Sequence, residues 1–274
     1  MNEKARPEVR TGSPVTLMLA LVTLLLIVCG AGVTIVAKWW TEQPTADSLH
    51  AAAMHYPEDI PKLMTMGHRV DALDKQGRTP LFLAAVFGKG KSVKPLLDAG
   101  ADANLPGPDG RTPLIAATFP TKCGANESMI HELLEAGADP SITESTNEKY
   151  SPLHHAVWGN SLVVVEDLIA HGADLESRDS HNWTPLHLAT QFESTSVDIV
   201  RALVDAGADL EARGHDGNTP LHYAVSSHAH DKIEHLLKAG ASRTAANEYG
   251  MLPIDQHQGD ERSKSLFEEI PAPE

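Results

Sequence analysis

The sequence has few cysteines, few aromatic residues and little positive charge. Its 274 residues include two cysteines, and because Cys29 lies in an apolar run, we expect no disulfide between it and Cys123. Lys and Arg number 22 against 37 Asp and Glu, and beyond residue 45 the counts are 18 and 34. Nucleic-acid binding needs clustered Lys and Arg, so we expect no nucleic-acid partner. A neutral or basic protein partner suits such an acidic chain better.

The sequence motifs of common enzymes are missing as well. There is no Gly-rich phosphate loop, no G-x-S-x-G and no H-E-x-x-H. Paired carboxylates such as Asp205 and Asp209 fit a solvated face, and Cys123 beside Lys122 is interpreted as an incidental thiol rather than a reactive one. We therefore predict that the protein is not an enzyme, with no cofactor, no bound metal and no small-molecule substrate.

One long hydrophobic run interrupts this polar composition near the N-terminus. Residues 15–37 form 23 consecutive uncharged residues, about 34 Å as a helix against a hydrocarbon core of about 30 Å. Trp39 and Trp40 follow where an interfacial aromatic belt would lie. The run is therefore predicted to be a single transmembrane helix, after a short N-terminus (1–14) and before a tether (38–45).

The charges beside this run predict its orientation. Lys4, Arg6 and Arg10 precede it, whereas only Lys38 follows closely. The positive-inside rule then places the N-terminus in the cytoplasm and the remaining chain on the extracytoplasmic side, the periplasm in a bacterium. A cleaved signal peptide is the alternative, with "CGA" at 29–31 as its cleavage site, but the apolar run continues past this point, which favours an uncleaved anchor.

Beyond residue 45 the chain repeats itself. The phrase "TPLHLAT" at 184–190 recurs in related form, and its leucine aligns with others at spacings of 32, 33, 39, 33, 35 and 33 residues: Leu49, Leu81, Leu114, Leu153, Leu186, Leu221 and Ile254. A period near 33 indicates a repeat protein. Thr followed by Pro is typical of a helix start. A second apolar cluster follows in each unit and ends at a glycine placed as a helix C-cap, such as Gly100 or Gly207.

These units resemble the ankyrin repeat family. The resemblance rests on the Thr-Pro-Leu-His/Phe-x-Ala cores, on the Leu-Leu-x-x-Gly-Ala-Asp endings such as 96–102 and 133–139, and on the 33-residue step. It implies an all-α solenoid of helix-turn-helix-hairpin units over 46–270, whose concave face and hairpin tips bind proteins. We expect an N-terminal cap (46–74), five repeats (77–246) and a more polar C-terminal cap (250–270), because a terminal unit has one uncovered face.

Some units depart from the pattern. The stretches 119–128 and 143–149 of the second unit are longer than usual and are expected to protrude. Lys149 and Asn182 stand where the other hairpins have glycine, and a positive φ is harder for Lys than for Asn.

The histidines have two interpretations. The resemblance implies that the motif histidines His50, His154, His187 and His222 are structural and link adjacent turns. His228, His230 and His235 could offer imidazole ligands to a metal, although no cysteine accompanies them and the spacing matches no zinc pattern. A metal-handling protein that uses them is the alternative function, and a cytoplasmic adaptor with reversed topology is another.

The aromatic residues supply the candidate binding site. Aromatics make up only 5% of the chain, yet one falls at the end of the first helix in four consecutive units: Phe87, Phe119, Trp158 and Phe192. Large rigid rings are typical interface anchors, whereas the alternative is that each ring packs under the next repeat. Trp183, Arg178, Arg213 and His215 in the hairpins are further candidates for partner contact. The predicted function is a membrane-anchored module that binds a partner protein and scaffolds, protects or inhibits it.

Overall fold

The computed structural model describes residues 46–119, 127–146 and 148–271, all within one unit of the chain, Ala46–Glu274. The predicted N-terminus (1–14), transmembrane helix (15–37) and tether (38–45) lie outside the described residues, as do Cys29 and Cys123. Within the described ranges, no helix is both long enough and apolar enough to span a bilayer.

The described chain is all-helical, and none of its residues is assigned to a strand. Its elements in chain order are α3 (Ala46–His55), η1 (Pro57–Asp59), α4 (Ile60–Thr65), α5 (Pro80–Val86), α6 (Gly90–Asp98), α7 (Pro113–Thr118), α8 (Glu127–Glu135), α9 (Pro152–Trp158), α10 (Leu162–Ala170), α11 (Pro185–Gln191), α12 (Val197–Asp205), η2 (His215–Gly217), α13 (Pro220–Ser226), α14 (His230–Lys238), η3 (Pro253–Gln256) and α15 (Glu261–Glu269).

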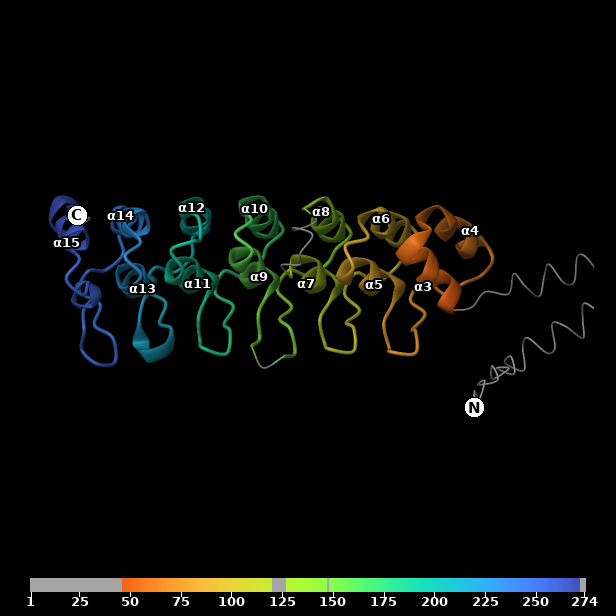
Figure 1. Ribbon diagram of the computed structural model, residues 1–274, viewed down its shortest axis with the longest axis horizontal. Helices are drawn as coiled ribbons and strands as arrows, with labels where there is room; N and C mark the ends of the chain where they lie inside the picture. Colours follow the sequence, from red (N-terminus) through yellow and green to blue (C-terminus); the bar gives the residue numbers. More distant parts are fainter. Residues whose placement is uncertain (1–45, 120–126, 147, 272–274) are drawn as a thin grey trace, which may run out of the picture. The chain divides into compact units, whose positions relative to one another are not determined.

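The helices of this unit stack in two layers (Figure 1). An inner layer holds α3, α5, α7, α9, α11 and α13, and an outer layer holds α4, α6, α8, α10, α12 and α14. Each inner helix contacts the inner helix before and after it as well as its own outer helix. Long loops extend from the inner layer on the side away from the outer helices. The apolar face of each pair is therefore covered by its neighbours in the stack.

The inner helices begin where the sequence predicts. Thr79, Thr112, Ser151, Thr184 and Thr219 are the N-caps, each followed by proline at the first helical position. In the first of these, the Thr79 hydroxyl accepts from the backbone N–H of Phe82 at 3.1 Å. The cap satisfies a donor that the helix leaves unpaired, and proline has no N–H to lose there.

The outer helices end at glycines in the left-handed region, also as predicted. Gly100 has φ +87°, and its N–H donates to the carbonyl of Leu97 while the N–H of Ala101 reaches that of Leu96. This pair of bonds is a Schellman motif, which favours glycine because a Cβ is strained at this φ.

The long loops are hairpins without strands. Each is closed by main-chain bonds, such as those from the N–H of Asp179 to the carbonyl of Trp183 and from the N–H of Asn182 to that of Asp179. Lys149 and Asn182 adopt φ +57° and +61°, so the left-handed turn is kept where glycine is absent. The insertion at 119–128 is described only at its ends. In the other long segment Thr143, Ser145, Glu148 and Lys149 are exposed, whereas Glu144 is buried.

The core follows the periodic leucines. The motif leucines from Leu49 to Leu221 have 0% exposure, whereas Ile254 in the last, more polar unit is half-buried. Leu96, Leu133, Leu168, Leu203 and Leu236 supply the outer-helix side and are also fully buried. Complete burial of one leucine contributes roughly 1.5–3 kcal/mol before entropy is subtracted. The repeated apolar positions therefore form one continuous core through the stack.

Candidate protein-binding surface

The four predicted aromatic residues lie at the C-terminal ends of successive inner helices. Phe87, Phe119 and Phe192 are the C-cap residues of α5, α7 and α11, and Trp158 is the last residue of α9. The exposed fraction is 51% for Phe87, 39% for Phe119, 38% for Phe192 and 54% for Trp158. Each side chain therefore keeps part of its surface open to solvent, although Phe119 and Trp158 also contact a ring of the next repeat. Their contact with a partner stays a prediction.

Three of these rings belong to a connected aromatic group. Trp158 and Phe192 meet edge to face with centroids 5.5 Å apart, and Tyr150 lies 6.4 Å from Trp158. Tyr150 also contacts His155, which in turn lies 5.2 Å from Phe119. We call Tyr150, Trp158 and Phe192 the aromatic corner. Phe87 makes no ring contact within the described residues.

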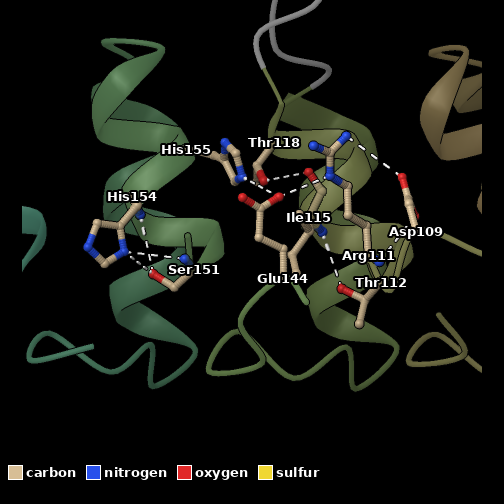
Figure 2. Close-up of polar contacts among 9 residues, drawn as sticks. All are labelled: Asp109, Arg111, Thr112, Ile115, Thr118, Glu144, Ser151, His154 and His155. Carbon is tan, nitrogen blue, oxygen red and sulfur yellow. Dashed lines mark hydrogen bonds and ion pairs between the residues drawn. The ribbon is translucent and has the colours of Figure 1, made fainter. Parts of the chain in front are cut away.

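Arg111, Glu144 and His155 form a polar group next to Phe119, and Figure 2 shows these three side chains. Arg111 lies over the Phe119 ring, with the guanidinium carbon 4.9 Å from the centroid, and its Nε donates to Glu144 at 3.0 Å. Figure 2 shows the Glu144 carboxylate between Arg111 and His155. The Nε2 of His155 lies 3.6 Å from Oε2 of Glu144, and both side chains are almost fully buried.

The surroundings shift the pKa values of this group in one direction. Burial opposes the charged form of Glu144, but hydrogen bonds to the carboxylate, including that from Arg111, outweigh it and lower its pKa. Burial also lowers the pKa of His155, an effect that Glu144 only partly offsets. At neutral pH the group therefore holds one ionised pair, Arg111 and Glu144, beside a neutral imidazole.

Trp183, a further candidate for partner contact, has partners within the chain. It is partly buried against the core, and its Nε1–H donates to the hydroxyl of Tyr223 at 2.8 Å. The two rings meet edge to face at 5.2 Å. The reason is its position directly before the cap Thr184, where the chain has already turned back toward the inner helices.

The predicted hairpin arginines link hairpins to each other. Nη1 of Arg178 donates to the carbonyls of Asn182 and Arg213 at 3.0 and 2.5 Å. Nη1 of Arg213 repeats this arrangement with Gly217 and Ala246. Both guanidinium groups already have partners, so a structural role accounts for them. The side chain of His215 is 68% exposed and lies 3.5 Å from Asp216.

Each motif histidine ties its own unit to the next, as expected. In His187, Nδ1 accepts from the backbone N–H of Thr184 at 3.1 Å, and Nε2 faces the carbonyl of Asn218 at 3.2 Å. His50, His154 and His222 place Nε2 at 2.8–3.1 Å from the corresponding carbonyl. Because Nδ1 of His187 must accept while Nε2 donates, the ring is neutral. Burial accordingly lowers the pKa of His187 to about 4.

Two of the three histidines that suggested a metal site, His228 and His230, serve another contact. His228 and His230 both face one carboxylate, with His230 Nε2 2.7 Å from Asp260 Oδ2 and His228 Nδ1 3.6 Å away. Asp260 is the N-cap of α15, so these contacts join the last repeat to the terminal helix. Among the residues that the structure describes, no group of three or more His, Cys, Asp or Glu side chains is placed to hold a metal ion.

Comparison with known families agrees with this architecture. A sequence profile described as "Ankyrin repeats (3 copies)" matches residues 18–106, 49–144, 89–179, 121–214 and 153–247. The chain belongs to the ankyrin repeat family. Ankyrin repeats generally mediate protein–protein interaction.

Solved ankyrin repeat domains superpose on most of the chain. The human ASB11 ankyrin repeat domain matches with a TM-score of 0.65 and 27% identity, over 82% of this chain and 99% of that one. The ankyrin repeat domain of Bcl-3, a member of the IkappaB family, matches with a TM-score of 0.69 over 80% and 97%. At 22% identity, the second likeness shows the fold alone.

The curated relatives are longer proteins with other parts. The inactive serine/threonine-protein kinase TEX14 of mouse is 38% identical over 100 residues, 35% of this chain and 7% of that protein. The human mitochondrial disaggregase is 30% identical over 133 residues, 47% of this chain and 18% of that protein. This ankyrin repeat chain thus spans less than a fifth of the length of these relatives.

Four residues that lie beside the candidate rings were not predicted from the sequence: Arg111, Glu144, Tyr150 and His155. A signal existed for the last one, since His155 stands where other units have Leu83, Ala116, Leu188 and Tyr223. Glu144 could not be found, because only the folded hairpin brings it beside Arg111. Lys232 was also missed; it is buried and its Nζ donates to the carbonyls of Ala189 and Phe192, while burial lowers its pKa to about 8.

Proposed function

We propose that this protein binds a partner protein across the inner face of its repeats, with Phe119, Trp158 and Phe192 as anchors. The observation that carries the proposal is the set of rings at the ends of α7, α9 and α11, which keep 38–54% of their surface accessible in a well-packed stack. Exposure of an aromatic ring to water costs free energy, and clusters of exposed rings on a rigid scaffold are typical of binding surfaces.

The scaffold supports the same conclusion. The Phe119 ring contacts Arg111 and His155, and the Trp158 and Phe192 rings contact each other. Rings fixed in this way lose little conformational entropy when they bind, so more of the contact energy remains for affinity. We propose a scaffolding, protective or inhibitory role toward the partner, and no reaction of the chain's own.

The test is capture of the partner by the full chain and by matched variants. Trp158→Ala and Phe119→Ala should each reduce recovery of the same proteins, because loss of an interface anchor costs about 2 kcal/mol or more. Val163→Ser is the control, since Val163 is 54% exposed but lies on the outer helix α10. Equal recovery with all three variants would contradict the proposal.

We further propose that residues 15–37 anchor the protein in a membrane and that the repeats lie on the extracytoplasmic side, in the periplasm if the source is bacterial. The length of the apolar run and the excess of Lys and Arg before it support this topology. A reporter fused after Glu274 checks it. Reporter activity on the cytoplasmic side would instead support an adaptor of opposite topology, and full extraction of the chain by carbonate would contradict anchoring.

A further inference from the structure

We propose that the aromatic corner of Tyr150, Trp158 and Phe192 binds a cationic side chain, Arg or Lys, of the partner protein. This inference rests on the proposed function, because it names the chemistry by which that surface would recognise its partner. It goes beyond a general apolar contact in that a neutral side chain of the same shape should bind poorly.

The ring geometry suits a cation. Trp158 and Phe192 are inclined at 66° with centroids 5.5 Å apart, and Tyr150 is inclined at 41° to Trp158 at 6.4 Å. A cation is attracted to an aromatic face within about 6 Å of its centroid, most strongly to tryptophan. Trp158 and Phe192 are exposed, whereas Tyr150 is half-buried and stacks on His154 at 5.7 Å, so a cation can approach the first two rings with Tyr150 beside them.

The same surface already contains one such contact made by the chain itself. Arg111 lies over Phe119 at 4.9 Å. Within the described residues, no Lys or Arg lies in this way over Trp158 or Phe192, although both rings are accessible. The protein therefore fills the Phe119 face with its own guanidinium group and leaves the neighbouring corner open to one from a partner.

The charges that act on Tyr150 are negative and favour a positive occupant, whereas the Nζ of the buried Lys232 lies against the main-chain carbonyl of Phe192. Glu148 is exposed, accepts from the Ser180 hydroxyl and forms no ion pair with a Lys or Arg among the described residues. The Asp179 carboxylate is buried: its Oδ1 accepts from the backbone N–H groups of His181 and Trp183, and its Oδ2 lies 3.9 Å from Nδ1 of His181, so it acts on the corner only through its field. Burial raises the pKa of the Tyr150 hydroxyl, and the negative charges of Asp179, Glu148 and Glu144 raise it further. Beyond residue 45, 18 Lys and Arg stand against 34 Asp and Glu, so the wider field also attracts a basic segment.

The experiment uses short peptides with one variable side chain. The full chain, labelled with ¹⁵N, is titrated at low salt with acetyl-Gly-Ser-Gly-Arg-Gly-Ser-Gly-amide and with the same peptide carrying citrulline in place of arginine. Citrulline keeps the shape of arginine but has no charge. The readout is the indole N–H signal of Trp158, assigned by its loss in Trp158→Leu, with the signals of Trp39, Trp40 and Trp183 as internal references.

We expect a saturable shift of the Trp158 signal with the arginine peptide and about fivefold weaker binding of the citrulline peptide. Phe192→Leu and Glu148→Gln should each weaken arginine binding about threefold or more, whereas Phe87→Leu, at an exposed ring outside the corner, should leave it unchanged. Because these side chains are exposed, we expect all three variants to fold, and circular dichroism checks that they do.

Two results would overturn the inference: equal binding of the citrulline and arginine peptides, or unchanged arginine binding in Phe192→Leu. Either result combined with partner capture that still depends on Trp158 would reject the cation chemistry but keep the proposed function. Binding of arginine at the corner, combined with capture that ignores Trp158 and Phe119, would support the cation site and reject the proposed function.

Discussion

The Nε2 of His187 lies 3.2 Å from the main-chain carbonyl oxygen of Asn218, 31 residues further along the chain. Since Nδ1 of the same ring accepts from the N–H of Thr184, one side chain caps its own helix and bonds the next hairpin. Secondary structure and stacking therefore depend on the same imidazole.

His187→Ala should destabilise the protein by about 2–3 kcal/mol, because it leaves a buried N–H and a buried carbonyl without partners and opens a cavity. Urea unfolding of the full chain measures the change. His131→Ala is the control, since the His131 side chain is 56% exposed on α8, and should change stability by less than about 0.5 kcal/mol. Equal losses in the two variants would argue against the double role of His187.

The buried histidines should make the fold sensitive to acid. The pKa of His187 is about 4 in the folded state against 6.5 ordinarily, and the pKa values of His154, His155 and His222 are also lowered by burial. Between pH 6.5 and 4 the unfolded chain binds more protons than the folded one, so stability falls as pH falls through this window. Unfolding midpoints at pH 7.5, 6 and 5 test this, and His187→Gln should have a shallower slope. An equally steep slope in the variant would contradict the assignment.

Gly107→Ala should destabilise the joint between α5 and α7 by about 1–3 kcal/mol. A Cβ at Gly107 would lie 2.3 Å from the ring of Phe82, which is itself buried. Gly90→Ala is the matched control, because its Cβ would meet nothing nearer than 3.9 Å. Thermal unfolding compares the two, and a Gly107→Ala variant as stable as Gly90→Ala would show that the ring yields freely.

Arg111 and Glu144 should be energetically coupled. Removal of Glu144 leaves the guanidinium beside Phe119 without its carboxylate, and we expect Glu144→Ala to cost about 2 kcal/mol, less than for a fully buried pair because Arg111 is partly exposed. In a double-mutant cycle, Arg111→Met combined with Glu144→Ala should cost less than the two single changes added together. If the changes in unfolding free energy were strictly additive, the interaction between Arg111 and Glu144 would contribute nothing to stability.

Lys149→Gly should stabilise the protein by about 0.5–1 kcal/mol, because Lys149 adopts φ +57° at a cost that glycine does not have. Asn182→Gly, at φ +61°, should gain less, since asparagine tolerates this region. The melting temperatures of the two variants, compared with that of the unchanged protein, measure these gains in stability. A larger gain at Asn182 than at Lys149 would contradict the ranking.

The helices were predictable from the sequence because their determinants are local. Thr-Pro or Ser-Pro starts and glycine ends act within one unit, and the motif leucines recur once in each unit, where the stacked neighbours bury them. The exposure of Trp158 and Phe192 was not predictable, since the same positions could equally have packed under the next repeat. The burial of Trp183 and the hairpin bonds of Arg178 and Arg213 were not predictable either. They depend on contacts between residues 30 or more positions apart, which a local sequence pattern does not reveal.

The histidine bonds between units are missing at two consecutive joints, where Phe82 and Ile115 replace the imidazole. The first joint relies on the Phe82 ring against Gly107, and the second has the ion pair of Arg111 and Glu144. Under a mechanical load applied to its two ends, the protein should consequently yield first between α5 and α9, where an apolar contact and one Arg–Glu pair replace the two histidine bonds.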